Sequence, residues 1–494
     1  MSETTFDPAA LRHLNEFFVG GSWIPAATDE RAAVVNPSNE DVLAYVAEPS
    51  TRDVDLAVEA ARRAFDDGPW PTMTVAARIA HVRRFTEALM KRSAEIGDAW
   101  GLECGPTAPF RDAINNLVAP TVYSDAFALA ESLPEFERRD GFAGPVEIHR
   151  EPYGVAVSIL TYNGPMSYVG MKVLPALLTG NVVIVKLPVE TRLTGQLFAE
   201  AAEEADLPPG VLSLLAADRE ASSYLVSHPG VDVVSFTGGT EVGSKVLHGT
   251  ADRIVKTMLE LGGKSAGIVA PDVSTEDLLP MVLPGLLPFQ GQVCVALTRL
   301  LVPPARRDEI AGALAQVFGS LKIGDAMDPG TEFGPVAVAR TRDRCEKFVA
   351  DAVAEGATVV AGGKRPAHLD RGWYYEPTLL VDVDNGMQIA QEEVFGPVFT
   401  VLTYDDMDDA VKIANDSPYG LTGAIFTHDA ELARNVGRRV RAGSFTRNST
   451  GGVLGQPFGG YKRSGLGREM GLEGYLEWTQ TKVMKIDTTA NYLA

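Results

Sequence analysis

One cysteine of this sequence stands in a setting that suits a nucleophile. Cys294 lies within the stretch from Phe289 to Arg299, with amide side chains and a glycine before it and an apolar run after it. A thiolate is intrinsically nucleophilic, and backbone N–H groups around it can lower its pKa and receive a developing oxyanion. The competing interpretation is a buried structural cysteine, which is the usual state of a free cysteine in a soluble protein.

Two charged residues end apolar runs that are typical of buried strands. Glu260 follows Met258 and Leu259 and precedes two glycines. A half-desolvated carboxylate there has a raised pKa and suits a general base, whereas the alternative is an ordinary surface glutamate. Lys186 ends a run rich in Val and Ile, where a parallel sheet presents ligand contacts. Its alternative is a solvated lysine at a strand end.

The segment from Ser235 to Gly243 predicts a phosphate-binding turn. An apolar strand runs into Gly238 and Gly239, and a helical pattern follows. N–H groups at the start of that helix can face a pyrophosphate. Thr240 stands where the G-x-G-x-x-G fingerprint has its middle glycine, so a simple tight turn is the competing interpretation.

Alternating strand and helix patterns must position these groups. The elements predicted between Glu151 and Val269 are, in chain order, strand 155–160, helix 166–178, strand 181–186, helix 191–205, and strands 211–216 and 231–236. This βαβ rhythm predicts an α/β fold whose parallel sheet is covered on both faces and binds ligands at the carboxyl ends of its strands. Earlier in the chain, short strands near 18–23 and 34–35 and helices from Asp53 and over 75–90 are predicted.

Composition and charge exclude several classes of protein. The 494 residues, 45% apolar and 22% charged, can bury large cores and divide into two or three domains. The formal charge of −21 argues against nucleic acid or an anionic membrane surface as a partner. The acidic N-terminus predicts no secretory signal, and no apolar run reaches the roughly 18 residues that a membrane span needs.

The cysteines and histidines favour a reducing compartment. Cys104, Cys294 and Cys345 are odd in number and widely spaced, which does not predict a disulfide framework or a metal site. The seven histidines are scattered without ligand spacing. We therefore expect a cytoplasmic protein without a metal.

Taken together, these stretches resemble the aldehyde dehydrogenase superfamily over nearly the whole chain. The matching pieces, in the family's order, are Thr161-Tyr162-Asn163, Lys186, Phe236 to Gly243, Glu260 to Lys264, Gly291 to Cys294, Glu392 to Val398 and Pro457 to Lys462. Each piece is short enough to arise by chance, but their joint occurrence in this order is not. The resemblance implies the NAD(P)-dependent oxidation of an aldehyde to a carboxylic acid.

The matching motifs imply roles for individual residues. Cys294 would attack the aldehyde carbon, Asn163 and the Cys294 N–H would hold the oxyanion, and Glu260 would activate the water that hydrolyses the thioester. The residues that the resemblance assigns to the cofactor are Thr161, Tyr162, Lys186, Glu190, Thr237, Gly238, Gly239, Leu261, Glu393 and Phe395. Lys186 and Glu393 would hold the two riboses.

The family's architecture would divide the chain into three units. These would be a Rossmann-like NAD(P)-binding domain of residues 1–133 and 152–262, an α/β catalytic domain of residues 263–478, and a small β oligomerisation flap of residues 134–151 and 479–494. Both pieces of the flap have the pattern of short strands, which need a partner sheet for stability. The resemblance implies a homodimer or homotetramer.

Departures from the family pattern concern the cofactor and the substrate. Val189 stands where many NAD-preferring members carry a glutamate, with Glu190 next to it, so NAD is expected and NADP stays open. Gly164 and Met171 replace residues that are usually aromatic, which predicts a wider or differently shaped entrance. The side chains expected to line an apolar pocket are Tyr168, Phe289, Val293, Val295, Val453 and Phe458. A neutral apolar or aromatic aldehyde is expected, with Arg447 left without an assigned role.

Three other functions compete with this one. A CoA-acylating dehydrogenase would pass the thioester to CoA, but Glu260 at the position of the hydrolytic base speaks against it. A non-catalytic member of the superfamily would have no need for Asn163, Glu260 and Cys294 together. An unrelated thiol hydrolase would need a histidine base, and none of the histidines is recognisably placed for that role.

Overall fold

Runs of buried Val, Ile and Leu form the central strands of the first lobe. The computed structural model describes residues 6–141 and 144–485, and within them this lobe contains an eight-stranded sheet in the order β19-β11-β10-β7-β8-β9-β1-β2. Its strands are β1 Glu16–Val19, β2 Ser22–Pro25, β7 Val155–Ile159, β8 Val182–Leu187, β9 Leu212–Ala216, β10 Val233–Gly238, β11 Lys256–Leu261 and β19 Gly465–Leu466. Helices on both faces exclude water from the central strands, which accounts for their nearly continuous apolar sequences.

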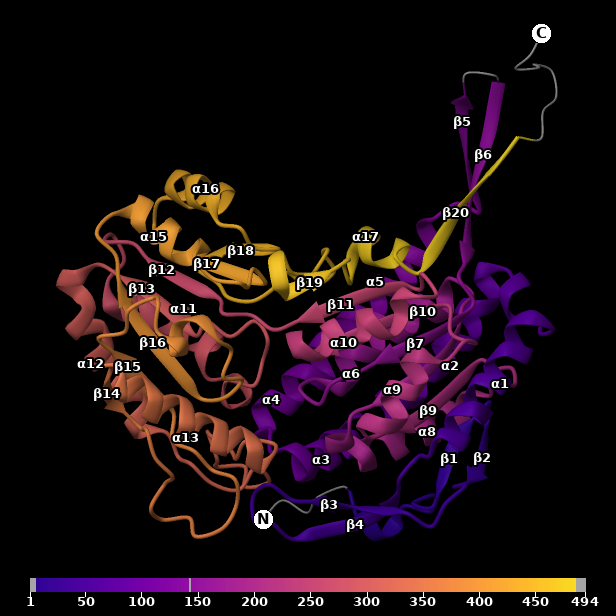
Figure 1. The fold of residues 1–494 in the computed structure, drawn as a ribbon, viewed down its shortest axis with the longest axis horizontal. Coiled ribbons are helices and arrows are strands. Elements are labelled where there is room, and N and C mark those ends of the chain that lie inside the picture. Colours follow the sequence, from indigo (N-terminus) through magenta and orange to yellow (C-terminus); the bar gives the residue numbers. More distant parts are fainter. Residues whose placement is uncertain (1–5, 142–143, 486–494) are drawn as a thin grey trace.

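The helices of the first lobe precede the sheet strands or connect them (Figure 1). They are α1 Thr51–Asp66, α2 Val75–Lys91, α3 Ser93–Cys104, α4 Ala108–Ala113, α5 Ala119–Ser132, α6 Pro165–Tyr168, α7 Leu174–Leu178, α8 Arg192–Ala205, α9 Arg219–Ser227 and α10 Thr240–Ala251. A separate hairpin of β3 Arg31–Val35 and β4 Val42–Ala47 lies near the N-terminal end. The predicted strands and helices of this region agree with the observed ones to within about two residues at most ends.

The order of the sheet reverses beside β7. β8 and β9 extend the sheet to one side of β7, and β10 and β11 extend it to the other. At such a point the loops that follow two neighbouring strands diverge and leave a crevice at the carboxyl ends. Thr161 to Asn163 follow β7, and Gly238 ends β10, so both predicted motifs border this crevice.

The helix predicted at 166–178 is interrupted by a wide turn. The chain forms α6, then a π-type turn over Val169–Val173, then α7. Pro175 has no N–H to donate to the carbonyl four residues earlier, whereas the N–H of Leu174 donates to the carbonyl of Val169. The proline therefore explains why a regular α-helix does not continue through this segment.

A second α/β lobe lies beside the first (Figure 1). Within the described residues, its seven-stranded sheet contains β14 Thr358–Ala361, β15 Thr378–Val381, β16 Val398–Thr403, β13 Arg299–Val302, β12 Ala266–Val269, β17 Thr422–Phe426 and β18 Ser444–Arg447, in that spatial order. Its helices are α11 Thr275–Leu286, α12 Arg307–Ser320, α13 Ala339–Ala354, α14 Gln388–Gln391, α15 Met407–Asn415 and α16 Ala430–Arg439, and the short α17 Gly471–Leu476 follows near β19.

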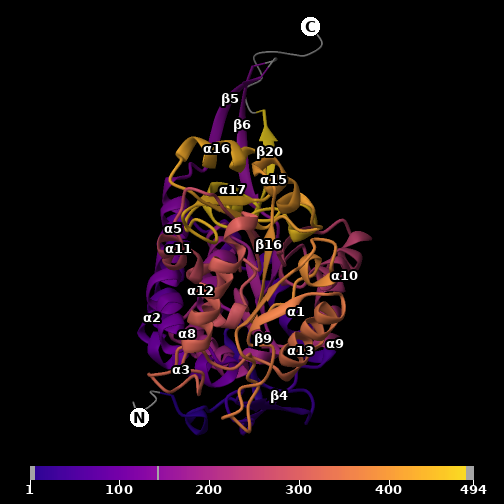
Figure 2. The same ribbon diagram turned by 90° about the vertical axis from the view of Figure 1, so that its left-hand side faces the viewer.

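A three-stranded sheet projects from the first lobe (Figures 1 and 2). β20 Thr479–Met484 pairs with β6 Gly144–Pro152, which pairs with β5 Phe136–Gly141. The two segments predicted to form short strands therefore join in one sheet. Residues 1–5, 142–143 and 486–494 of the predicted units lie outside the described residues.

Asn181 connects the base of the projecting three-stranded sheet to the eight-stranded sheet of the first lobe. Its Oδ1 accepts hydrogen bonds from the backbone N–H groups of Tyr153 and Gly154, at 2.8 and 3.0 Å. Its Nδ2 donates to the carbonyl of Trp478, at 2.9 Å, just before β20. The side chain is fully buried, so water cannot replace these bonds.

Asn181→Ala should destabilise the protein markedly. Each buried backbone group left without a partner costs ~1–3 kcal/mol, and three such groups are affected. We expect the melting temperature, measured by circular dichroism, to fall by roughly 3 °C or more. Asn435→Ala, at an exposed position on α16, is the control and should change it little. Equal melting temperatures for the two variants would contradict the role of Asn181.

Candidate active site

Cys294 follows a turn of strained backbone. Phe289 and Gln290 have φ angles of 47° and 53°, in the left-handed region that residues with a side chain rarely adopt. The buried Phe289 ring packs against Trp100 and Phe110, with ring centroids 5.7 and 5.6 Å away. This aromatic packing holds the turn in a conformation that would otherwise be unfavourable.

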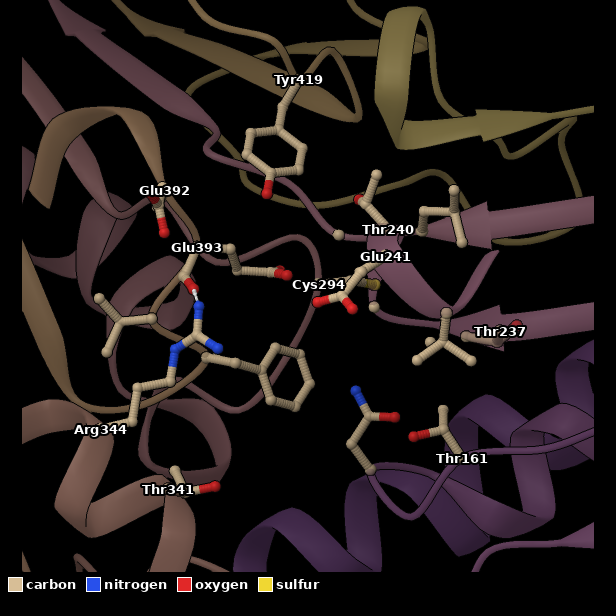
Figure 3. A pocket seen from close by; sticks show the side chains of 18 of the residues that line it. Thr161, Thr237, Thr240, Glu241, Cys294, Thr341, Arg344, Glu392, Glu393 and Tyr419 are labelled. Carbon is tan, nitrogen blue, oxygen red and sulfur yellow. Dashed lines mark hydrogen bonds between the residues drawn. The ribbon is translucent and has the colours of Figure 1, made fainter. Parts of the chain in front are cut away.

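Two cavities meet at Cys294. The larger has a volume of about 1070 Å³ and the smaller about 260 Å³. The residues that line both are Asn163, Tyr168, Thr237, Glu260, Leu261 and Cys294. Figure 3 shows the larger cavity with Thr161 and Thr237 on one side, Thr341 and Arg344 on the other, and Cys294 between them.

The larger cavity has the features of a dinucleotide site. Of the predicted cofactor residues, those that line it are Thr161, Tyr162, Thr237, Gly238, Gly239, Leu261, Glu393 and Phe395. Gly239 precedes α10, and a Cβ built on it would meet nothing within 4 Å, so the start of this helix borders open space. The buried Oγ1 of Thr237 has no hydrogen-bond partner within the described chain. A pyrophosphate suits both a helix start and an unpaired hydroxyl donor.

Lys186 and Glu190 are placed differently from the other predicted cofactor residues. In the described chain, neither is among the residues that line the larger cavity. Burial lowers the pKa of Lys186 to about 8. The carboxylate of Glu190 forms an ion pair with Arg340 of α13, which does line the cavity.

Glu393 and Phe395 approach the larger cavity from the second lobe. Oε1 of Glu393 accepts a hydrogen bond from the N–H of Gly263 at 3.1 Å, and burial raises the pKa of this carboxyl to about 7. The Arg344 guanidinium donates to the Glu393 carbonyl. Phe395 meets the ring of Tyr162 edge to face, with 6.2 Å between ring centroids.

The Asn163 side chain is held in one orientation. Its Nδ2 donates to the carbonyl of Gln292 at 3.1 Å, and its Oδ1 accepts from the hydroxyl of Tyr168 at 3.1 Å. The amide has two N–H groups, and one of them satisfies Gln292. The second is available for an oxyanion formed beside Cys294.

Glu260 is a buried carboxyl beside other charged groups. Its Oε2 has no hydrogen-bond partner among residues 6–141 and 144–485. Burial, followed by the charge of Glu469, raises the pKa of Glu260 well above its ordinary range. Glu469 pairs with the fully buried Lys172, whose Nζ also donates to Ser235 Oγ at 2.7 Å.

The same enclosure makes Cys294 a weak acid in the ligand-free protein. Desolvation raises the pKa of its thiol to about 12, and the charges of Glu393 and Glu260 act in the same direction. The thiol is therefore protonated near neutral pH. Its conversion to a nucleophile requires a proton acceptor or a positive charge nearby.

The smaller cavity is lined mainly by apolar side chains. These include Phe110, Ile114, Val118, Tyr168, Met171, Val293, Val295, Leu454, Phe458 and Met470. Two expectations for this lining are wrong: Phe289 is buried in the aromatic cluster under the turn, and Val453 is 56% exposed outside the lining. Arg447 lies on β18, where it donates to the carbonyl of Thr427 at 3.3 Å.

Several residues of the site were not identified from the sequence. Phe110, Ile114 and Val118 come from α4 and the turn after it, a region for which the sequence analysis predicts neither an element nor a site residue. Lys172 offered a signal, because a single lysine inside an apolar helix must be buried with a partner. Glu469, 297 residues later, had no local signal that it would be this partner.

The described part of the chain has neither a metal-binding cluster nor a membrane-spanning helix. Among residues 6–141 and 144–485, no group of three or more His, Cys, Asp and Glu side chains could hold a metal ion. Over the same residues, no helix is both long and apolar enough to cross a membrane. The three cysteines are free, and Cys104 and Cys345 are fully buried.

Comparisons with known proteins agree on one family. The model of the aldehyde dehydrogenase family matches residues 23–484 of this chain. Geranial dehydrogenase of Castellaniella defragrans is 38% identical over 457 residues, which are 92% of this chain and 95% of that protein.

Solved structures give the same result for the fold. An aldehyde dehydrogenase of Mycobacterium tuberculosis, complexed with NAD⁺, has a TM-score of 0.93 and 37% identity, with 97% of this chain and 99% of that chain covered. A cysteine-to-alanine variant of aldehyde dehydrogenase C from Pseudomonas syringae, with NAD⁺ and octanal, has a TM-score of 0.92 and 35% identity, with 98% of each chain covered.

The ligand-free protein should react slowly with iodoacetamide at Cys294. With a thiol pKa of about 12, the thiolate fraction and hence the alkylation rate should rise roughly tenfold per pH unit from about pH 7 to 9. Mass spectrometry of the peptide that contains Cys294 measures this rate. Cys294→Ser is the control for labelling of the buried Cys104 and Cys345. A rate that does not change with pH would mean that the thiolate is already formed.

Proposed function

The chain belongs to the aldehyde dehydrogenase family, and on this premise we propose that it oxidises an apolar aldehyde to the carboxylic acid with NAD⁺ as the hydride acceptor. The observation that carries this proposal is that Asn163, Glu260 and Cys294 line both cavities. The larger cavity has room for a dinucleotide, and the smaller one suits a hydrocarbon chain. A carbon bonded to Cys294 Sγ would therefore face a cofactor on one side and the substrate's own cavity on the other.

Cys294 acts as the nucleophile. Its sulfur bonds to the aldehyde carbon, and its proton passes to Glu260, whose raised pKa makes this carboxylate basic enough to accept it. The aldehyde oxygen becomes an oxyanion. The side-chain amide of Asn163 and the backbone N–H of Cys294 donate hydrogen bonds to that oxygen, which lowers the barrier to its formation.

The oxyanion then collapses to a thioester on Cys294 as the C–H bond breaks and a hydride leaves. Bound NAD⁺ supplies the acceptor for this hydride. Glu260, after returning its proton to solvent, removes a proton from a water molecule whose oxygen bonds to the thioester carbon. The C–S bond breaks, the carboxylic acid leaves, and the thiol of Cys294 is restored.

NAD⁺ is the proposed cofactor in preference to NADP⁺. The solved relatives from M. tuberculosis and P. syringae hold NAD⁺. In this chain Arg340, which lines the cavity, forms an ion pair with Glu190, so the Glu190 carboxylate would compete with a 2′-phosphate for this arginine. Val189 supplies no carboxylate to the adenosine ribose. The preference for NAD⁺ over NADP⁺ therefore depends on the pair of Glu190 and Arg340.

The proposed substrates are neutral aldehydes with aliphatic or aromatic chains. The smaller cavity surrounds the approach to Cys294 with side chains such as Ile114, Met171 and Phe458. A charged substrate would lose its hydration there. The lining includes Glu260 and Glu469, which would repel an anion, and Glu469 already pairs with Lys172, so it offers little to a cation. Two relatives support this choice, since one is named geranial dehydrogenase and the structure of another holds octanal, whereas a relative from Bacillus subtilis is named betaine aldehyde dehydrogenase.

We also propose self-association through the projecting sheet. β20 is an edge strand of this sheet within the described residues, and Val483 on it is 63% exposed. An unpaired edge is a surface that another strand can extend. Size-exclusion chromatography with light scattering would determine whether the protein is a dimer or a tetramer.

Glu260→Gln should allow one turnover and then stop. Hydride transfer needs no water, so reduced cofactor should still form up to the concentration of active sites, although more slowly because Gln cannot accept the Cys294 proton. Thioester hydrolysis should slow by roughly 10² or more, so turnover stops at this step. Stopped-flow absorbance measures the burst, and intact mass measures the acyl group on Cys294. Cys294→Ala is the control, and it should bind NAD⁺ without any burst. Undiminished steady-state turnover by Glu260→Gln would contradict its role as the base.

A substrate panel should separate apolar from charged aldehydes. We expect kcat/KM for octanal and benzaldehyde to exceed that for betaine aldehyde or succinic semialdehyde by roughly 10² or more. A charge loses its hydration in this cavity, Glu260 and Glu469 repel an anion, and Lys172 already pairs with Glu469. Each aldehyde is tested with NAD⁺ or NADP⁺, with and without CoA, by absorbance of the reduced cofactor. Turnover that depends on CoA would mean that the thioester is transferred to CoA and not hydrolysed. A preference for a charged aldehyde would contradict the apolar assignment.

A further inference from the structure

We propose that the hydroxyl of Tyr168 positions the side-chain amide of Asn163 for oxyanion binding, so that Tyr168 is a positioning residue and not merely a wall of the cavity. This inference rests on the proposed function, because it assigns Tyr168 a part in the same reaction. Tyr168 does not itself contact the oxyanion. Its effect reaches the reacting atoms through Asn163.

The two ends of the Asn163 amide have different partners. Oδ1 accepts from the Tyr168 hydroxyl, and Nδ2 donates to the Gln292 carbonyl, both at 3.1 Å. A carbonyl is only an acceptor, so Gln292 favours the orientation in which the nitrogen faces the loop of Cys294. Tyr168 satisfies the oxygen end in that same orientation, where it would otherwise be buried without a partner.

The hydrogen bond from Tyr168 also affects the strength of the donor. An amide whose oxygen accepts a hydrogen bond is more polarised, and its N–H groups become better donors. The second N–H of Asn163, which Gln292 leaves free, would therefore bind an oxyanion more strongly. Preorganised donors of this kind contribute more to catalysis than donors that must reorient during the reaction.

Tyr168 is well suited to remain a donor. It is 9% exposed, and burial together with the charges of Cys294 and Glu469 raises its pKa well above its ordinary value. The phenol therefore stays protonated throughout the pH range in which the enzyme would work. The ring lies on α6, five residues after Asn163, where the N–H of Tyr168 donates to the Gly164 carbonyl at 3.2 Å.

Tyr168→Phe tests this role because it removes the hydroxyl and keeps the ring. We expect kcat for octanal oxidation to fall roughly three- to tenfold, with KM changed less than about twofold, because a hydrogen bond is lost and not the shape of the cavity. Tyr123→Phe is the matched control. Its hydroxyl is also buried and donates to the Met166 carbonyl at 2.9 Å, but it is not among the lining residues of either cavity in the described chain.

A double-mutant cycle distinguishes positioning from a general structural role. In an Asn163→Ala background, Tyr168→Phe should cause no further loss in the single-turnover rate of reduced-cofactor formation, since there is no amide to position. An equal loss in both backgrounds would overturn the proposal. So would unchanged kcat for Tyr168→Phe in an otherwise active enzyme, or an equal fall in kcat for Tyr123→Phe.

The design keeps this inference separate from the proposed function. Failure of the unsubstituted protein to reduce NAD⁺ with any aldehyde would remove the proposed function itself. Should Tyr168→Phe prove unstable by thermal denaturation, Tyr168→Met also lacks the hydroxyl and is measured in the same cycle. A loss that depends on Asn163 supports the inference, and a loss that does not depend on it overturns the inference.

Discussion

The hydrogen bonds of Gln292 fix the junction between the two lobes at the reacting sulfur. Its carbonyl accepts from Asn163 in the first lobe, and its side-chain oxygen accepts from the N–H of Ala337 in the second, at 3.0 Å. Its Nε2 donates to the Phe289 carbonyl at 3.1 Å, which closes the strained turn. Gln292 is fully buried, so water does not compete for these bonds. The two cavities meet at Cys294, two residues later, because both lobes hold this one loop.

That geometry also gathers acidic groups around the sulfur. Burial raises the pKa of Cys294 and of Glu260; the charges of Glu393 and Glu260 add to the shift for Cys294, and the charge of Glu469 adds to the shift for Glu260. Like charges buried near one another are costly to ionise together, so the site favours retention of protons. Lys172 offsets part of this cost through its ion pair with Glu469. The chemistry therefore depends on the movement of protons that burial has made hard to remove.

The sequence predicted what local patterns determine. The parallel strands that end near Asn163 and Gly238 follow from apolar runs and turn glycines, which are signals confined to a few residues. The candidate residues Glu260 and Cys294 were also recognisable from the short motifs around them. By contrast, the pairing of Lys172 with Glu469 depends on the packing of distant segments, and no local pattern encodes it. The lining contributed by α4 was missed for the same reason. The wide turn at Val169–Val173 was missed although Pro175 is a local signal for it.

Gly164, one of the departures from the family pattern, lies where it affects the position of Tyr168. A Cβ on Gly164 would come within 2.8 Å of Ser167 Oγ and 3.8 Å of the Tyr168 ring. Ser167 Oγ donates to the Gly164 carbonyl at 2.7 Å, so a side chain at position 164 would disturb the turn that carries Tyr168. The absence of a side chain there thus leaves the phenol in reach of Asn163. Because the same ring lines the smaller cavity, the shape of that cavity and the orientation of the Asn163 amide are linked, and a change in one should alter the other.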